Sequence, residues 1–300
     1  MPSRAHDAVV QMLRGGDVFA TSDGVLDVPK LRKNLEAMSA TTAMPENTTV
    51  EPVVAAGVPA EWLSGPGADS SRVLLYLHGG GYILGSIATY RALAARIAAA
   101  AGIRALIIDY RLAPEHPFPA AIEDATAAYG FLLGHGFTPE RVAMGGDSAG
   151  GGLAIATLIA LREAGLPLPA AAVVLSPWTD LEGSGDSMRT CVDRDPIIGS
   201  KEGLLATAAL YLNGVDPRMP TASPLYADLH GLPPIAIQVG TAERLLDDSI
   251  RIAQRIQEAG GAVELETFAD LIHVFQAWAP HIPESLDAID KLGSFLRRHL

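Results

Sequence analysis

A serine within a glycine-rich pentapeptide is the first residue of this chain that could do covalent chemistry. Ser148 stands in the run GDSAG (146–150), which has the pattern Gly-x-Ser-x-Gly. Glycines two residues before and after the serine permit a sharp turn from a strand into a helix, and such a turn exposes the hydroxyl. The pattern therefore predicts that Ser148 is a nucleophile for acyl transfer.

The same glycine-rich region could instead bind phosphate, because glycine turns before helices also bind dinucleotides. The run GGDSAGGG (145–152) lacks the G-x-G-x-x-G spacing and the lysine of a P-loop. Nucleotide binding is therefore the weaker interpretation.

A second glycine cluster, HGGGY (78–82), follows an apolar run at 73–77. Acyl transfer builds negative charge on the carbonyl oxygen of the substrate, and fixed backbone N–H groups stabilise that charge. We expect the N–H groups of Gly79 and Gly80 to act together with that of Ala149, the residue after the nucleophile. His78 is interpreted as a brace for this loop.

A base and an acid must follow the nucleophile in the order Ser, Asp or Glu, His. Of the eight histidines, only His273, His281 and His299 come late enough. His281 lies among prolines and His299 is the penultimate residue, whereas His273 comes just after an apolar stretch at 263–268. We therefore predict that His273 is the base.

The acid is expected in the run GTAERLLDD (240–248), after another apolar stretch. A carboxylate there could accept a hydrogen bond from the imidazole and stabilise the imidazolium that forms. Glu243 is favoured, and Asp247 remains an alternative. The other interpretation of Asp247 and Asp248 is that they cap the helix that follows.

Apolar strands and helices alternate along the chain and must position these residues. Strands are predicted near 50–54, around Trp62, and at 73–77, 105–108, 141–144, 171–175, 235–239 and 263–268. Helical patterns follow at about 90–101, 120–133, 150–164, 247–259 and 283–299, after a mixed helical segment at about 5–45. Continuous apolar strands alternating with helices predict an α/β fold with a mostly parallel sheet, covered on both faces.

One long interval departs from this alternation. About 60 residues separate the strand ending at Leu175 from the one beginning at Ile235. Residues 183–224 carry turn signals around a short helix near 201–211, which predicts a cap over the site. An irregular surface excursion is the alternative.

Composition excludes several classes of protein. Among 300 residues, 49% are hydrophobic, so a sizeable core is expected. The net charge of −12 disfavours nucleic acid and anionic lipid as partners. Cys191 is the single cysteine, so no intrachain disulfide is possible. No secretory signal and no apolar stretch long enough to span a membrane is visible, which predicts a soluble, cytoplasmic protein.

The chain resembles the bacterial hormone-sensitive-lipase-like esterases. The resemblance is carried by HGGGYILGS (78–86), DYRLAPEHPFPAAIED (109–124), GGDSAGGGLA (145–154), SPWTDLEGSG (176–185), DRDP (193–196) and the GTAERLLDD and IHVF segments. It implies an α/β-hydrolase fold over residues 1–300, with an eight-stranded, mostly parallel sheet. It also implies a cap made of about residues 1–45 and 183–224.

The resemblance also implies a function, namely hydrolysis of short- to medium-chain carboxylic esters without cofactor or metal. Ser148 would be the nucleophile, His273 the base, and Gly79, Gly80 and Ala149 the oxyanion donors. The family usually has aspartate where this chain has Glu243. Asp147 and Asp195-Pro196 are interpreted as residues that fix loops.

Two other functions remain open. A lactone or amide hydrolase would use the same residues, and a non-catalytic small-ligand receptor could use the same fold. The resemblance also suggests a homodimer through the sheet edge at 263–268.

Overall fold

An eight-stranded sheet forms the centre of the molecule. The computed structural model describes residues 2–15, 26–40 and 42–300, so part of the predicted N-terminal cap segment lies outside the described residues. The strand order is β1-β2-β4-β3-β5-β6-β7-β8. The strands are β1 (Thr49–Ala55), β2 (Val58–Ser64), β3 (Asp69–Leu77), β4 (Ile103–Ile108), β5 (Val142–Asp147), β6 (Ala171–Leu175), β7 (Ile235–Gly240) and β8 (Val263–Phe268).

The sheet is mostly parallel, as the alternation of strands and helices predicted. Strand β2 pairs antiparallel with both β1 and β4, and every other neighbouring pair is parallel. All residues of β5 and β6 are buried, which explains why their sequences, apart from Asp147 at the end of β5, are continuous apolar or glycine runs without polar alternation. The two edge strands, β1 and β8, are more exposed.

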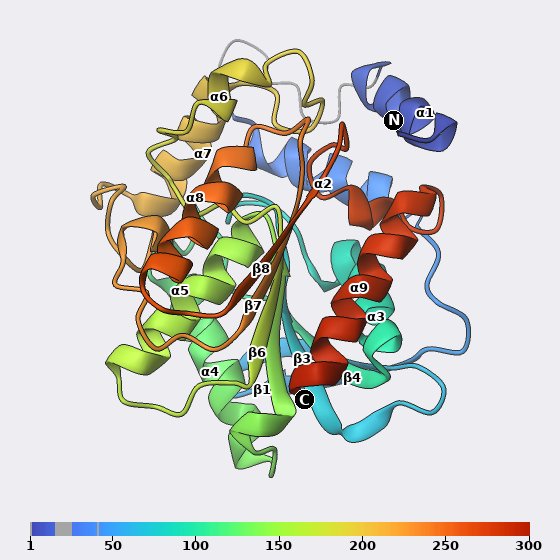
Figure 1. The fold of residues 1–300 in the computed structure, drawn as a ribbon, viewed down its shortest axis with the longest axis vertical. Coiled ribbons are helices and arrows are strands. Elements are labelled where there is room, and N and C mark those ends of the chain that lie inside the picture. The colour runs from blue at the N-terminus through green and yellow to red at the C-terminus, as the bar shows by residue number, and fades with distance from the viewer. Residues whose placement is uncertain (1, 16–25, 41) are drawn as a thin grey trace.

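Helices cover both faces of the sheet (Figure 1). One face carries α4, α5 and α8, and the opposite face carries α3 and α9 (Figure 1). The helices are α1 (Arg4–Gly15), α2 (Val28–Ser39), α3 (Ile87–Ala101), α4 (Ala120–Gly134), α5 (Ala149–Glu163), α6 (Ser187–Thr190), α7 (Lys201–Leu212), α8 (Leu246–Glu258) and α9 (Pro283–His299). This arrangement confirms the predicted α/β-hydrolase architecture.

The parallel strands end at one edge of the sheet, where α2, α6 and α7 also lie (Figure 1). The HGGG segment follows β3, Ser148 follows β5, Glu243 follows β7 and His273 follows β8. Because ligands of open α/β sheets bind outside the carboxyl ends of the strands, this edge is the expected site.

The long interval between β6 and β7 contains α6 and α7, the latter close to the short helix predicted there. Within the described ranges, no helix is both long and apolar enough to cross a membrane.

Candidate active site

Ser148 lies on the sharp turn between β5 and α5 that the pentapeptide predicted. Its backbone has φ 51° and ψ −120°, a conformation that a residue with a side chain rarely adopts. A Cβ on Gly146 would lie 2.6 Å from the carbonyl oxygen of Leu77, and one on Gly150 would collide with the same atom. The flanking glycines are therefore required by the close approach of β3.

The three predicted triad residues meet in one line of hydrogen bonds. His273 Nε2 is 2.9 Å from Ser148 Oγ, and His273 Nδ1 is 3.1 Å from Glu243 Oε1. Glu243 is fully buried and His273 is only 4% exposed. Burial lowers the pKa of His273, but the Glu243 carboxylate, helped by the charges of Asp195 and Asp147, raises it, so the net effect is a raised pKa.

The second carboxylate oxygen of Glu243 is also fixed. Glu243 Oε2 accepts hydrogen bonds from Ser176 Oγ at 2.8 Å and from the Gly240 N–H at 3.0 Å. Ser176 Oγ in turn accepts from the N–H of Val274, the residue after His273, at 3.2 Å. Burial raises the pKa of Glu243, and His273 opposes that shift. Ser176 was not predicted as a site residue, although it follows an apolar strand and begins the SPWTDLEGSG run (176–185).

Asp247, the alternative acid, has a different role. Its Oδ2 accepts from the Ser187 N–H at 2.8 Å, so it links the start of α8 to α6. In the part of the chain that the structure describes, Asp247 makes no hydrogen bond to His273. His281 and His299 likewise make no hydrogen bond to Ser148 there.

The Gly79 amide, predicted from the sequence as an oxyanion donor, donates to a side chain in the structure. Its N–H donates to Asp147 Oδ1 at 3.1 Å, and Gly79 does not line the cavity above Ser148. Gly80 and Gly81 do line this cavity. Within the described ranges, the N–H groups of Gly80, Gly81 and Ala149 donate to no acceptor. In this loop, therefore, Gly80 and Gly81 are the glycines that line the cavity and whose amides have no acceptor in the described part of the chain.

Asp147 fixes the loop, as its position beside Ser148 suggested. Its Oδ1 also accepts from Tyr76 Oη at 2.8 Å. Asp147 is fully buried, and Oδ2 has no hydrogen-bond partner among the described residues. Burial raises the pKa of Asp147 to about 7, against the opposing effect of the Tyr76 hydrogen bond.

His78 braces the same loop from below. Its ring stacks on those of Tyr110 and Tyr90, with centroids 4.3 and 5.6 Å away, both nearly parallel to it. Burial lowers the pKa of His78 to about 4, so the ring is neutral at pH 7 and its Nδ1–H donates to the Gly79 carbonyl at 2.8 Å. The interpretation of His78 as a loop brace agrees with this geometry.

Asp195 also holds a loop, as expected. Its Oδ1 accepts from the N–H groups of Ile197 and Ile198, at 2.9 and 3.0 Å, and its Oδ2 from that of Arg244 at 2.9 Å. Asp195 thereby joins the segment before α7 to the acid loop.

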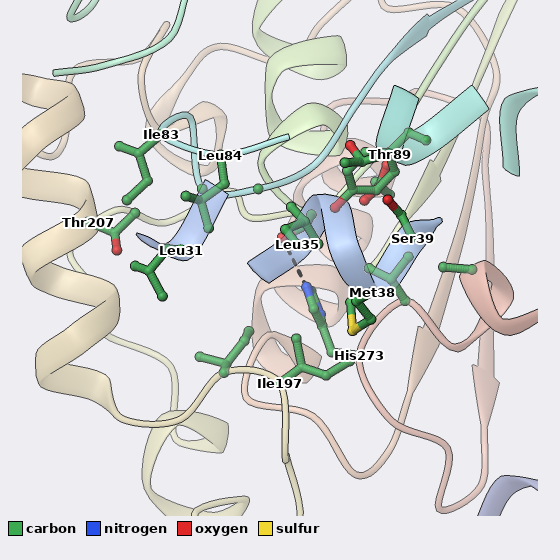
Figure 2. A pocket seen from close by; sticks show the side chains of 18 of the residues that line it. Leu31, Leu35, Met38, Ser39, Ile83, Leu84, Thr89, Ile197, Thr207 and His273 are labelled. Atoms are coloured by element: carbon green, nitrogen blue, oxygen red, sulfur yellow. Dashed lines mark hydrogen bonds between the residues drawn. The ribbon is translucent and has the colours of Figure 1, made fainter. Parts of the chain in front are cut away.

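A cavity of about 480 Å³ opens above Ser148. Figure 2 shows Leu31, Ile83 and Thr207 on one side of His273 and Ser39 and Thr89 on the other. Most of the remaining wall is apolar. It comes from α2, α3, α7, the loop before α7 and the segments that follow β3, β6 and β8, and it includes Leu26, Leu35, Met38, Leu84, Leu93, Trp178, Ile197, Ile198, Leu204, Val274, Ala277 and Trp278. A pocket of this size and character fits a small organic molecule.

Comparisons with known proteins agree with this geometry. Residues 74–277 match the family described as alpha/beta hydrolase fold. The chain is 49% identical over 238 residues to an acetyl-hydrolase of Streptomyces hygroscopicus, covering 79% of each protein. It is 39% identical to the putative acetyl-hydrolase LipR of Mycobacterium tuberculosis, covering 98% of this chain and 94% of LipR.

A solved structure gives the same result. The chain superimposes with a TM-score of 0.95 and 48% identity on an esterase from the bacterial hormone-sensitive lipase family, covering 100% of this chain and 99% of that one. This chain therefore belongs to the alpha/beta hydrolase fold family, among the bacterial hormone-sensitive-lipase-like esterases.

Proposed function

We propose that this chain is a serine carboxylesterase that hydrolyses short- to medium-chain esters, with Ser148, His273 and Glu243 as its catalytic triad. The observation that carries the proposal is the continuous line of hydrogen bonds from Ser148 through His273 to Glu243, placed at an apolar cavity. A receptor would need the cavity but not this proton path.

The first half of the reaction forms an acyl-enzyme. His273 Nε2 takes the proton of Ser148 Oγ as that oxygen attacks the ester carbonyl carbon. Glu243 accepts from Nδ1–H and stabilises the imidazolium. When the carbon–oxygen ester bond breaks, His273 returns the proton to the leaving alcohol.

The second half repeats these steps with water as the nucleophile. His273 takes a proton from the water as it attacks the acyl carbon, and the bond to Ser148 Oγ then breaks. The carboxylic acid leaves, and Ser148 regains its proton.

The tetrahedral intermediates carry a negative oxygen that needs hydrogen-bond donors. We assign this role to the N–H groups of Gly80, Gly81 and Ala149, because these amides have no other acceptor among the described residues. Ala149 is also the first residue of α5, whose positive N-terminal dipole favours negative charge.

The apolar walls favour an apolar acyl chain. Each methylene that the cavity buries contributes about 0.8 kcal/mol, which corresponds to about a four-fold gain in kcat/KM. The gain should end where the cavity is filled, so kcat/KM should pass through a maximum as the acyl chain lengthens.

Three further features belong to this proposal. Helices α1 and α2 together with residues 183–224 would form the cap over the cavity, since α2 and α7 supply much of its wall. The chain would act in the cytoplasm. Two copies would pair through the edge strand β8, which light scattering can test.

The decisive experiment is turnover of p-nitrophenyl esters by wild type and Ser148→Ala. Turnover should disappear in Ser148→Ala, while Ser294→Ala, which changes a partly exposed serine on α9, should match wild type. A fluorophosphonate should add its phosphonyl group to Ser148 Oγ with loss of fluoride. Wild-type turnover by Ser148→Ala would refute the assignment, and a panel that adds lactones and amides separates the related hydrolases.

A further inference from the structure

The loop that follows β3 has an unusual backbone. Three consecutive residues, Gly80, Gly81 and Tyr82, have positive φ values of 110°, 63° and 63°. Glycine adopts such values freely, whereas Tyr82 pays a steric penalty for its side chain. A strained conformation of this kind persists only where its surroundings enforce it.

The surroundings of Tyr82 include an aromatic ring from α7. The rings of Tyr82 and Tyr211 are stacked, with centroids 3.8 Å apart and planes inclined by 5°. Trp178 lies on Tyr82 as well, 6.2 Å away, and all three side chains are 1% exposed. The hydroxyl of Tyr211 has no hydrogen-bond partner in the described part of the chain. Tyr211 therefore acts on the loop through its ring.

A second residue of α7 contacts the neighbouring glycine. Thr207 Cγ2 lies 2.7 Å from the point where a Cβ on Gly81 would be. The Thr207 hydroxyl bonds back to the Gly203 carbonyl at 3.0 Å, which leaves the methyl group for this contact. Thr207 and Tyr211 are four residues apart on a helix, so both lie on the same face of α7.

We propose that Thr207 and Tyr211 of α7 are positioning residues that hold the loop 80–82 in its strained form and thereby aim the amides of Gly80 and Gly81. We call this pair the α7 clamp. The predicted effect of the α7 clamp on catalysis rests on the proposed function, because it assumes that these amides bind the oxyanion. The predicted effect of the α7 clamp on the conformation of the loop does not depend on that assumption.

The clamp has a consequence that ordinary core packing lacks. Loosening the loop removes stabilisation that exists only when the oxyanion has formed, so it should lower kcat and leave KM nearly unchanged. It should also lower the affinity for a trifluoromethyl ketone by the same factor as kcat/KM, because the adduct of this inhibitor with Ser148 carries an oxyanion. A general loss of packing would lower stability without lowering kcat and inhibitor affinity together.

The test compares Tyr211→Leu with Tyr211→Phe. Tyr211→Leu should lower kcat about 10- to 100-fold, because it displaces donors without deleting them. Tyr211→Phe keeps the ring and should stay near wild type. Tyr129 of α4 supplies a matched control, since it is another buried tyrosine whose hydroxyl has no partner among the described residues. Tyr129→Leu should lower stability but not change kcat or inhibitor affinity.

Amide hydrogen exchange tests the clamp without any turnover. Peptides covering residues 78–84 should exchange faster in Tyr211→Leu than in wild type, Tyr211→Phe or Tyr129→Leu. Should Tyr211→Leu fail to fold, Thr207→Ser removes only the methyl group and keeps the hydroxyl, and it should raise exchange in the same peptides. Unchanged exchange, or an effect confined to KM, overturns the clamp. Absence of Ser148-dependent turnover in wild type overturns the proposed function instead.

Discussion

Ser176 and Glu243 are 67 residues apart in the chain, yet Ser176 Oγ donates a hydrogen bond of 2.8 Å to Glu243 Oε2. The opposite oxygen of the same carboxylate lies against His273. Because the side chain is held at both oxygens, a glutamate can orient the imidazole even though the family usually has the shorter aspartate.

The first prediction concerns this acid. Glu243→Gln should lower kcat by about 10²- to 10⁴-fold, because an amide cannot stabilise the imidazolium as a carboxylate does. KM should change little, since the acid does not touch the substrate. Steady-state kinetics on one p-nitrophenyl ester measures both quantities.

Asp247→Asn is the matched comparison for that experiment. Asp247 binds the Ser187 N–H and is not bonded to His273. Its variant should keep kcat within a few-fold of wild type. A large loss in Asp247→Asn alone would show that the acid was assigned to the wrong residue.

The second prediction concerns pH. His273 must be neutral to accept the Ser148 proton, and its pKa is raised by Glu243 in spite of burial. Activity should therefore fall as pH decreases through a value above the usual histidine pKa of about 6.5. Glu243→Gln removes the negative charge, so the midpoint of kcat/KM against pH should move to lower pH.

Asp147→Asn is a control for the nearby Asp147 carboxyl group, because its pKa of about 7 falls in the pH range where activity is expected to change. Asp147 and Asp195 also raise the pKa of His273, but the effect of Glu243 is larger. The midpoint should thus move less in Asp147→Asn than in Glu243→Gln. The reverse order would contradict the electrostatic argument.

The third prediction concerns the tie between Asp147 and the loop. Asp147→Ala removes the acceptor for both the Gly79 N–H and Tyr76 Oη. An unpaired buried donor costs about 1 to 3 kcal/mol, so the unfolding free energy should fall by at least that amount. We also expect kcat to fall about ten-fold or more, because the loop loses its anchor.

Asp147→Asn retains an acceptor oxygen and should recover most of the stability and kcat that Asp147→Ala loses. Denaturant unfolding and turnover measured on the same samples check this. Equal losses in the two variants would mean that negative charge, and not hydrogen bonding, matters at this position.

The fourth prediction concerns the stability of the fold. Asp248 is buried, and its Oδ2 accepts the N–H groups of Thr179 and Asp180 at 2.8 and 2.9 Å. Burial, followed by the Asp180 charge, raises the pKa of Asp248 to about 8, against about 3.9 in the unfolded chain. Between these values the folded state holds a proton that the unfolded state has lost, so stability should fall as pH rises.

Thermal unfolding at pH 5.5 and 8.5 tests this sign. The Tm of wild type should fall between these values, and Asp248→Asn should show a smaller fall, by about 2 °C or more. Asp193→Asn, at an exposed position, should follow wild type. A wild-type Tm that rises over this range would refute the argument.

The alternation of strands and helices was readable because burial on both faces makes a strand uniformly apolar. The run at 141–144 became β5, and the helix expected at about 283–299 is α9 (Pro283–His299). The secondary structure of the region at about 5–45 was harder to predict from its sequence. Among its described residues it contains the helices α1 and α2, each with one apolar face.

Site residues could be predicted from the sequence where the chemistry allows few residue types, as at Ser148 and His273. The sequence does not predict which of several adjacent loop amides already donates to an acceptor. Gly79 and Gly81 are both glycines and look alike in the sequence. The structure shows that the Gly79 N–H donates to the side chain of Asp147, 68 residues away in the chain. Likewise, the support that Ser176 gives to Glu243 depends on the meeting of β6 and β7.

The face of α7 that holds the loop also forms part of the cavity wall. Leu204 and Thr207 line the cavity, and Tyr211 follows one turn later on the same side. Attempts to change substrate range by replacing residues of α7 would therefore alter turnover of every substrate along with selectivity. Paired substitutions in α7 and in the loop would be needed to separate the two.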